Sequence, residues 1–336
     1  MKLHFPYSTD QLLSLMQQDP DGFNRWEACQ QLGVQQLQSA VAAFLRGQAM
    51  QLDQRLIDAF ASLLEDESLD QAMVAHMLVL PTEAYLTELA DVVEVEAIHA
   101  AREFARRTIA AALKDLLLQV YHRSQRTGSY EPSADQIAQR SLRNVCLSYL
   151  MLLDAPESLE LCNQQFQQAD NMTDQMAALG ALVNCESAAA ALLKQQALDE
   201  FYARWQHEPL VVNQWFQVQA TARLPGTLET VLNLMQHPAF EFKNPNKLRA
   251  VIGAFCGQNA INFHQADGAA YAFLADQVIA LDKSNPQIGA RLVTPLTKWK
   301  KYPPARQEKM KAQLSRIIAQ GDLSKDIYEV VSKSLK

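Results

Sequence analysis

The sequence predicts an all-α protein, a superhelical stack of antiparallel helix pairs of the HEAT/armadillo-like α-solenoid class. Three observations support this prediction. Apolar residues recur three or four positions apart, and only 11 of the 336 residues are glycine. Proline stands mostly where a helical segment should begin. The helix starts of the second half recur at a nearly constant spacing, which is typical of stacked helical pairs.

The first seven residues have a β pattern. Leu3, Phe5 and Tyr7 are separated by single residues, and this alternation suits a strand with one buried face. A lone strand cannot pair its own backbone groups. We therefore expect residues 1–7 to be the strand remnant of a preceding β-sandwich domain, and residues 8–336 to form the helical domain. No apolar core of a signal peptide follows this start.

Capping and periodicity predict the helices of the first half. Ser8 with Gln11, and Ser133 with Gln136, have the spacing of a capping box, in which two side chains bond free amides of the first turn. Over residues 97–121, apolar side chains fall on one face, while arginine, lysine and aspartate fall elsewhere. This segment is therefore expected to be amphipathic helix.

A repeat is visible in the second half of the chain. Its helix starts lie about 36 to 41 residues apart, which leaves room for two helices in each interval. The spacing predicts stacked helix pairs that curve into a superhelix with a concave, binding side. The expected starts are Met172, Pro209, Pro245, Pro286 and Leu323.

Two of these starts are nearly alike. Each has an asparagine that can cap the helix, a proline at the first helical position, and an arginine about one turn later. The two segments are 244–249, which ends at Arg249, and 285–291, which ends at Arg291.

The charge balance argues against a nucleic-acid partner. The formal net charge is −7 at pH 7, whereas a protein that binds duplex nucleic acid normally carries a basic surplus. An acidic stretch over 53–96 and a basic stretch over 298–316 are interpreted as solvated faces, with contact to a neighbouring domain as the alternative. The aromatic and basic cluster around Trp299 is interpreted as a helix-end charge pattern.

The cysteines predict neither a disulfide framework nor a zinc knuckle, because they are odd in number and form no C-x-x-C pair. We interpret them as buried thiols in a reducing compartment. No apolar run reaches the roughly 18 residues of a membrane span. The five cysteines are Cys29, Cys146, Cys162, Cys185 and Cys256. Reduced thiols and the lack of such an apolar run together predict a soluble, cytoplasmic protein.

No catalytic motif is recognisable. A zincin needs H-E-x-x-H, and the nearest approach, His207-Glu208, is followed by proline and has no second histidine. His99 and Glu103 have helical spacing, which favours a hydrogen-bonded surface pair over a metal site. Nucleotide-binding and serine-hydrolase motifs are also absent from the sequence. We therefore predict no catalytic residue and no metal ligand, and expect the chain alone to be inactive.

Several ordered segments are more specific than these patterns. They are Arg140–Leu147, Asn171–Asp174, Asn213–Ala220, Asn244–Phe255, Phe263–Gly268 and Arg306–Met310, with looser matches at Tyr7–Leu12 and Phe23–Trp26. Together they resemble the C-terminal helical domain of the bacterial aminopeptidase N family, the alanyl aminopeptidases, which are zinc metallopeptidases of the gluzincin type. The resemblance covers essentially the whole chain.

The resemblance implies that catalysis and enclosure of the substrate are carried out by different domains of one polypeptide. In that family the zinc motif and the G-[AS]-M-E-N segment that binds the substrate's amino end lie in a separate catalytic domain, and neither motif occurs here. We therefore expect a non-catalytic domain of a zinc-dependent aminopeptidase that removes N-terminal amino acids from peptides. It would cover the active site, enclose the substrate cavity and admit only small or unfolded peptides. Its partners would be the catalytic and β-sandwich domains of the same polypeptide, with zinc in the catalytic domain.

The resemblance also implies a role for two residues, because family members present arginines from this domain toward the cavity, and Arg249 and Arg291 match those positions. A guanidinium stays charged at any working pH, and its fork of donors fits a carboxylate. Both residues are thus expected to steer the C-terminal carboxylate of a peptide substrate. The alternative is that they cap helices or form intramolecular ion pairs.

For the function of the whole chain, the alternative is a free-standing helical-repeat scaffold for protein interactions.

Overall fold

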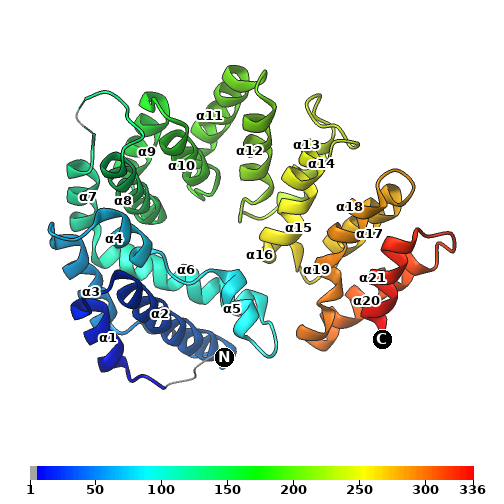
Figure 1. Cartoon of the computed structure of the whole chain (residues 1–336), viewed down its shortest axis with the longest axis horizontal. Coiled ribbons are helices and arrows are strands. Elements are labelled where there is room, and N and C mark those ends of the chain that lie inside the picture. Colours follow the sequence, from blue (N-terminus) through cyan, green and yellow to red (C-terminus); the bar gives the residue numbers. More distant parts are fainter. Residues whose placement is uncertain (1–5, 127) are drawn as a thin grey trace. The chain divides into compact units, whose positions relative to one another are not determined.

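The computed structural model describes residues 6–126 and 128–336, and every regular element within these ranges is helical (Figure 1). The chain divides into two compact units. Unit 1 is the described part of Met1–Leu86 and Ala97–Lys194, and unit 2 is formed by Thr87–Glu96 and Gln195–Lys336. None of the described helices is long and apolar enough to cross a membrane.

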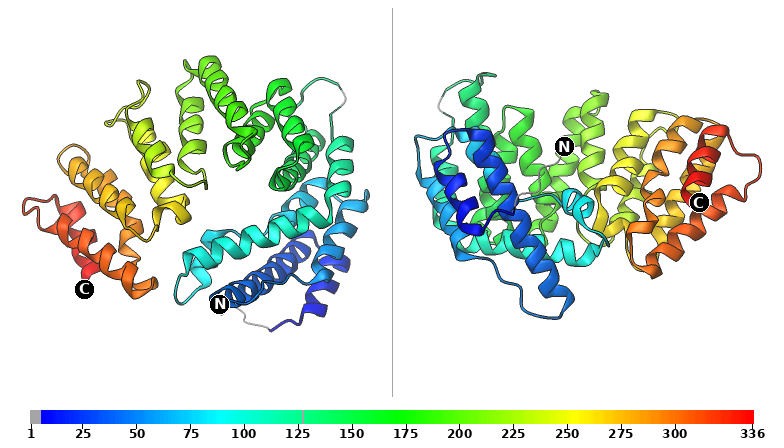
Figure 2. Two further views of the ribbon diagram at one scale, coloured as in Figure 1. Left: turned by 180° about the vertical axis from the view of Figure 1, so that it is seen from behind. Right: turned by 60° about the horizontal axis from the view of Figure 1, so that its bottom comes forward.

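Unit 1 is built from successive helices that pack as neighbours along the chain, for example α1 on α2, α7 on α8 and α9 on α10 (Figure 2). Short connections favour this arrangement of sequential helices. The helices are α1 (Thr9–Gln18), α2 (Gly22–Leu45), α3 (Gln54–Glu65), α4 (Gln71–Leu78), α7 (Lys114–Arg123), α8 (Ala134–Leu150), the 3₁₀ turn η1 (Met151–Leu153), α9 (Pro156–Gln168) and α10 (Met172–Val183). Three helices have residues in both units: α5 (Glu83–Leu89), α6 (Val95–Ala112) and α11 (Ala190–Trp205).

Unit 2 contains shorter helices, and some of them follow one another with almost no connection. Its core includes the edge-to-face rings of Phe255, Phe263 and Tyr271, whose centroids lie 6.3 and 5.3 Å apart in that order. The elements are α12 (Pro209–Ala220), α13 (Thr227–Met235), α14 (Pro245–Leu248), the π-helical turn η2 (Arg249–Gly253), α15 (Ala254–Gln258), α16 (Ala260–Phe263), α17 (Ala269–Asp282), α18 (Pro286–Leu292), α19 (Thr294–Thr297), the 3₁₀ turn η3 (Trp299–Lys301), α20 (Pro304–Ile318) and α21 (Lys325–Leu335).

The predicted helix starts of the second half are confirmed. α10 begins at Met172, and α12, α14 and α18 begin at Pro209, Pro245 and Pro286. The last start is displaced by two residues, from Leu323 to Lys325, because the Ser324 side chain accepts the amide of Ile327 and so caps α21. The strand expected over 1–7 lies mostly outside the described residues, and Pro6 and Tyr7 belong to no regular element.

The two predicted capping boxes differ in outcome. At Ser8 both bonds form: the Ser8 hydroxyl accepts the Gln11 amide, and the Gln11 side chain accepts the Ser8 amide. At Ser133 only the first half forms, with the amide of Gln136 donating to the hydroxyl at 3.4 Å. The side-chain oxygen Oε1 of Gln136 instead accepts the backbone amide of Glu131 at 2.8 Å, which ties the preceding loop to α8.

The amphipathic segment 97–121 lies in two helices, α6 and α7, that meet at Leu113. The backbone of Leu113 leaves the helical region, with φ −110° and ψ 18°. Neither proline nor glycine occurs at this position, so the break is set by packing: α7 is aligned against α3 and α8. The i to i+4 bonds around the break, Leu113 to Ile109 and Leu117 to Leu113, remain at 2.9 and 2.8 Å.

The charged stretches meet within unit 2. The ammonium of Lys301 donates to the backbone carbonyls of Thr87 and Glu88, at 3.2 and 3.0 Å, and Arg306 forms an ion pair with Glu96. The amide of Val93 also donates to the carbonyl of Lys301 at 2.7 Å. Most charged residues of both stretches are exposed, as the interpretation of solvated faces expects, but the two stretches also contact each other through the Arg306–Glu96 pair and the Lys301 bonds.

Candidate functional site

The first arginine predicted from the sequence, Arg249, follows a capped helix start in unit 2. The Asn244 side chain accepts the amides of Asn246 and Lys247, at 3.0 and 3.5 Å, and Pro245 occupies the first helical position. The Lys247 side chain is buried, with its ammonium 5.1 Å from the centre of the Phe216 ring, and burial lowers the pKa of this lysine. The start of the helix is thereby held against α12.

Arg249 itself opens a π-helical turn, in which the amide of Ala254 donates to the carbonyl of Arg249, five residues earlier. Such turns are rare and are frequent at functional sites, because the extra residue changes the direction in which side chains leave the helix. The Arg249 side chain is exposed, and its Nε donates to the carbonyl of Pro245 at 3.1 Å. This bond fixes the base of the side chain and leaves the terminal nitrogens to other partners.

The second arginine, Arg291, lies in the last turn of α18. This helix begins in the same way, with the Asn285 side chain accepting the amide of Ile288 at 3.4 Å and Pro286 at the first position. A cation near a helix C-terminus is favoured by the helix dipole. The Arg291 side chain is exposed and makes no hydrogen bond or ion pair with the described residues.

The two arginines come from neighbouring positions in the packing of unit 2. A Cβ atom placed on Gly253 would lie 3.8 Å from Cβ of Arg249 and 3.5 Å from Cδ2 of Leu292, the residue after Arg291. These are ordinary van der Waals distances, so the end of the π-helical turn packs against the Leu292 side chain of α18. Ion pairing, one of the two alternatives to a binding role, is not observed, since neither arginine contacts a carboxylate in the described part of the chain.

A buried amide network holds the helices beside this site. Asn259, which is 1% exposed, donates to the carbonyls of Ala220 and Ala222 at 3.1 and 2.7 Å. Asn262 donates to the Asn259 side chain at 3.0 Å. These bonds satisfy carbonyls at the C-terminal end of α12, and the Ala220 carbonyl has no other side-chain partner in the described structure. The network explains why asparagine occurs at both positions.

His264 forms the second network, and both its ring nitrogens are bonded. Nδ1 lies 2.9 Å from the Tyr271 hydroxyl, and Nε2 lies 2.9 Å from the Tyr302 hydroxyl. Burial lowers the pKa of His264 to about 3, and the nearby charge of Arg306 contributes to this lowering. The ring therefore stays neutral at physiological pH. It joins the start of α17 to the segment before α20, and it has a structural role.

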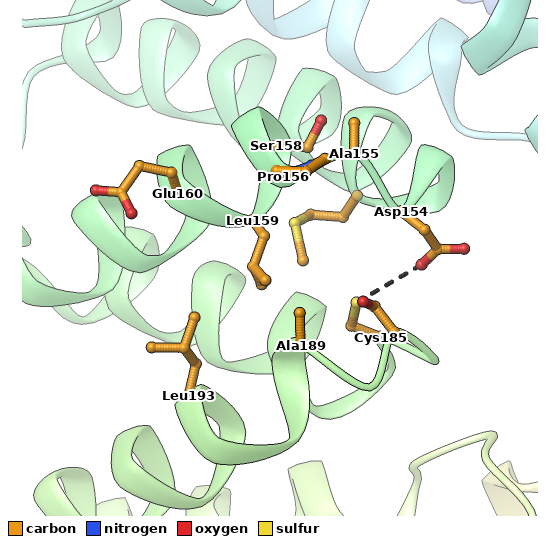
Figure 3. Close-up of a pocket in the computed structure, with 11 residues that line it drawn as sticks. Asp154, Ala155, Pro156, Ser158, Leu159, Glu160, Cys185, Ala189 and Leu193 are labelled. Atoms are coloured by element: carbon orange, nitrogen blue, oxygen red, sulfur yellow. Dashed lines mark hydrogen bonds between the residues drawn. The ribbon is translucent and has the colours of Figure 1, made fainter.

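A small hollow in unit 1 is a second candidate site (Figure 3). It has a volume of about 130 Å³, and its walls include Leu159 and Leu193. On one side the thiol of Cys185 lies 3.7 Å from the carboxylate of Asp154. Burial raises the pKa of this thiol, and the adjacent carboxylate raises it further, so the sulfur stays protonated and is a poor nucleophile.

The other cysteines and His99 form neither a nucleophilic site nor a metal site within the described residues. All five cysteines are buried and unpaired, and burial raises the pKa of Cys29 and of Cys146 to about 12. His99 bonds Glu83 at 2.8 Å, whereas Glu103 pairs with Arg106, so the expected His99–Glu103 pair is wrong. No group of three histidine, cysteine, aspartate or glutamate side chains could hold a metal ion in the part of the chain described.

Fold and site together define an all-helical repeat domain with exposed guanidinium groups available for binding. The chain belongs to the family described as DUF3458_C, a domain of unknown function with ARM repeats, whose model matches residues 9–336. The predicted helical-repeat fold class is thereby confirmed.

The chain is also similar to much longer proteins named aminopeptidase N. It is 38% identical to the one from Escherichia coli over 335 residues, and 37% identical to the one from Haemophilus influenzae over 336 residues. Both alignments cover 100% of this chain but 38% of the relative. The chain thus spans well under half the length of the curated relatives it matches, and the expected resemblance to the C-terminal helical domain of aminopeptidase N is confirmed.

A solved structure shows the same fold. The crystal structure of Legionella pneumophila aminopeptidase A in complex with aspartic acid superposes with a TM-score of 0.88 at 32% sequence identity. The match covers 99% of this chain and 39% of that chain.

Proposed function

We propose that the chain is the non-catalytic C-terminal domain of a zinc-dependent aminopeptidase that removes N-terminal amino acids from peptides. The observation that carries this proposal is the alignment of the whole chain with 38% of each of two aminopeptidases N. In the same polypeptide, the catalytic and β-sandwich domains are its partners. The domain covers the active site, encloses the substrate cavity and admits small or unfolded peptides.

Arg249 and Arg291 supply positive charge to that cavity. Their exposure, and the absence of a carboxylate partner in the described residues, support this role because each guanidinium is free to bind an anion. A peptide held by its amino end in the catalytic domain presents its terminal carboxylate to them. Positive charge in an enclosed, poorly hydrated space raises the local concentration of such anionic ends.

We assign the zinc ion to the catalytic domain and not to this chain. In the described residues, no cluster of potential ligands fits a metal ion, whereas a catalytic zinc site needs three protein ligands. This chain therefore contributes charge and shape, and its residues hold no reacting atom. Five buried, unpaired cysteines support a cytoplasmic location, where thiols remain reduced.

The proposal is tested by comparing this chain with a polypeptide that also includes the preceding domains. We expect the longer polypeptide to hydrolyse alanyl-anilide in the presence of zinc, and this chain alone to show no turnover. Hydrolysis of alanyl-anilide by the purified chain without the other domains would contradict the proposal. Failure of the longer polypeptide to bind zinc would instead favour the free-standing scaffold.

The covering role has its own test in the longer polypeptide. An unfolded peptide and a folded protein with the same N-terminal residues are offered as substrates. We expect kcat/KM for the folded protein to be at least tenfold lower, since it cannot enter an enclosed cavity. Equal values for the two substrates would show that the domain does not restrict access.

A further inference from the structure

A polar cavity in unit 1 is used by none of the roles above. It has a volume of about 210 Å³ and lies where the segment after α7 meets α8, the end of α9 and the start of α10. This volume exceeds that of several water molecules. The charged residues in its wall are Arg126, Arg140, Arg143, Asp170 and Asp174, so three guanidinium groups face two carboxylates.

Both carboxylates already have partners. Asp170 is bonded through both oxygens to Arg126, and the hydrogen bond from Arg126 lowers the pKa of Asp170. Asp174 accepts the side-chain amides of Asn144 and Asn171, at 2.9 and 3.0 Å. Three guanidinium groups against two carboxylates leave the wall with one net positive charge.

Arg140 carries most of this surplus. It is 7% exposed, yet its guanidinium makes no ion pair with a described residue. Its one side-chain hydrogen bond in the described structure is to Gln136, at 3.4 Å, and it stacks over the ring of Tyr130 at 5.0 Å. A buried charge with so few partners is costly, because the guanidinium has five N–H donors and loses water on burial.

Arg143 lies beside Arg140 in the wall. Its Nη2 donates to the Tyr121 hydroxyl at 3.0 Å and its Nη1 lies 3.9 Å from Asp174. Behind the wall, the Nε of Arg143 and the hydroxyl of Ser124 are buried and have no partner in the described structure. Native proteins leave few buried polar groups unbonded, so this region is less completely bonded than an ordinary core.

We infer that this cavity binds a small oxyanion, a carboxylate or a phosphate, through the N–H donors of Arg140 and the terminal nitrogens of Arg143. Guanidinium groups bind both kinds of oxyanion through parallel N–H···O bonds. The anion neutralises the net positive charge of the wall and takes the donors that Arg140 leaves open. All residues involved belong to unit 1, so the inference does not depend on the proposed role of Arg249 and Arg291.

Calorimetric titration of the intact 336-residue chain tests the inference. The probes are citrate and inorganic phosphate, each added at constant ionic strength with sodium chloride as the reference salt. We expect saturable binding of one anion per chain, and Arg140→Gln should weaken it at least tenfold. Binding of citrate alone identifies a carboxylate site, and binding of phosphate alone identifies a phosphate site.

The matched control is Arg107→Gln. Arg107 lies on α6 of the same unit, outside the cavity, and it is half-buried and paired with Asp154 and Glu186. The Arg107→Gln variant should bind the anion with the same affinity as the unaltered chain. If Arg140→Gln does not fold, as judged by circular dichroism, Arg140→Lys serves instead; it keeps the charge but lacks the fork of donors, and should weaken binding severalfold.

Two results would overturn the inference. One is the absence of saturable binding of either probe by the unaltered chain; the other is equal weakening by Arg140→Gln and Arg107→Gln. The titration is repeated on a polypeptide that includes the preceding domains. Loss of binding there would mean that a neighbouring domain fills the cavity, which also contradicts a site for a free anion.

Discussion

Two groups of buried polar side chains, one in each unit, differ in how completely they are bonded. In unit 2, both ring nitrogens of His264 meet a tyrosine hydroxyl at 2.9 Å, and the amide of Asn259 spans two carbonyls. In unit 1, Arg140 makes one long hydrogen bond and the Ser124 hydroxyl makes none within the described structure. The saturated network therefore has a structural role, whereas the unsaturated cavity is a candidate binding site.

The largest effect on stability is expected in the saturated network. Asn259→Ala removes the partner of the buried Ala220 carbonyl, while the Ala222 carbonyl keeps a bond from Thr227 at 2.9 Å. The free energy of unfolding should fall by about 2–3 kcal/mol in urea denaturation. The control is Gln217→Ala, which alters an exposed residue of α12 and should change stability by less than about 0.5 kcal/mol. Equal effects of the two variants would remove the distinction between the units.

The second prediction concerns pH. The pKa of His264 is about 3 in the folded chain and about 6.5 when unfolded, so between these values the unfolded state binds the extra proton. Stability from this group is complete above pH 6.5 and is lost as the pH falls, by about 1.4 kcal/mol per pH unit. His264→Gln should flatten the dependence between pH 6 and 4. An unchanged slope would show that the histidine is already protonated in the folded chain.

The smallest effect is expected at the unsaturated cavity. Without added anion, Ser124→Ala should leave stability unchanged or raise it by up to about 1 kcal/mol, because it removes a buried hydroxyl that has no partner in the described structure. Thermal unfolding in chloride buffer measures this. Destabilisation by more than about 1 kcal/mol would show that the hydroxyl is bonded in solution, and the contrast between the units would weaken.

The parts of the fold predicted correctly from sequence depend on local interactions. Proline at the first helical position and a capping side chain act within one turn, so the starts at Pro209, Pro245 and Pro286 follow from the sequence alone. The break at Leu113 does not, because it depends on how α7 packs against helices distant in sequence. The Gln136 side chain likewise bonds a loop amide that its spacing from Ser133 does not reveal.

The same limit applies to the functional residues. The repeated Asn-Pro start marks the positions of Arg249 and Arg291, and the family resemblance implies their role, but the π-helical turn and its packing against Leu292 depend on tertiary structure. The cavity in unit 1 was missed, although Arg140 and Arg143 lie three apart on α8 and thus on one face. Only the structure shows that the acids opposite them are already bonded to other side chains.

The most direct test of the proposed role of this chain is the preference of the longer polypeptide for a free terminal carboxylate. It is measured as kcat/KM for a short peptide divided by kcat/KM for the same peptide amidated at its C-terminus. Arg249→Ala should lower this ratio about tenfold, chiefly by raising KM for the free peptide, and should leave hydrolysis of an amino-acid amide nearly unchanged. An unchanged ratio, or equal losses on both substrates, would contradict carboxylate steering by this domain.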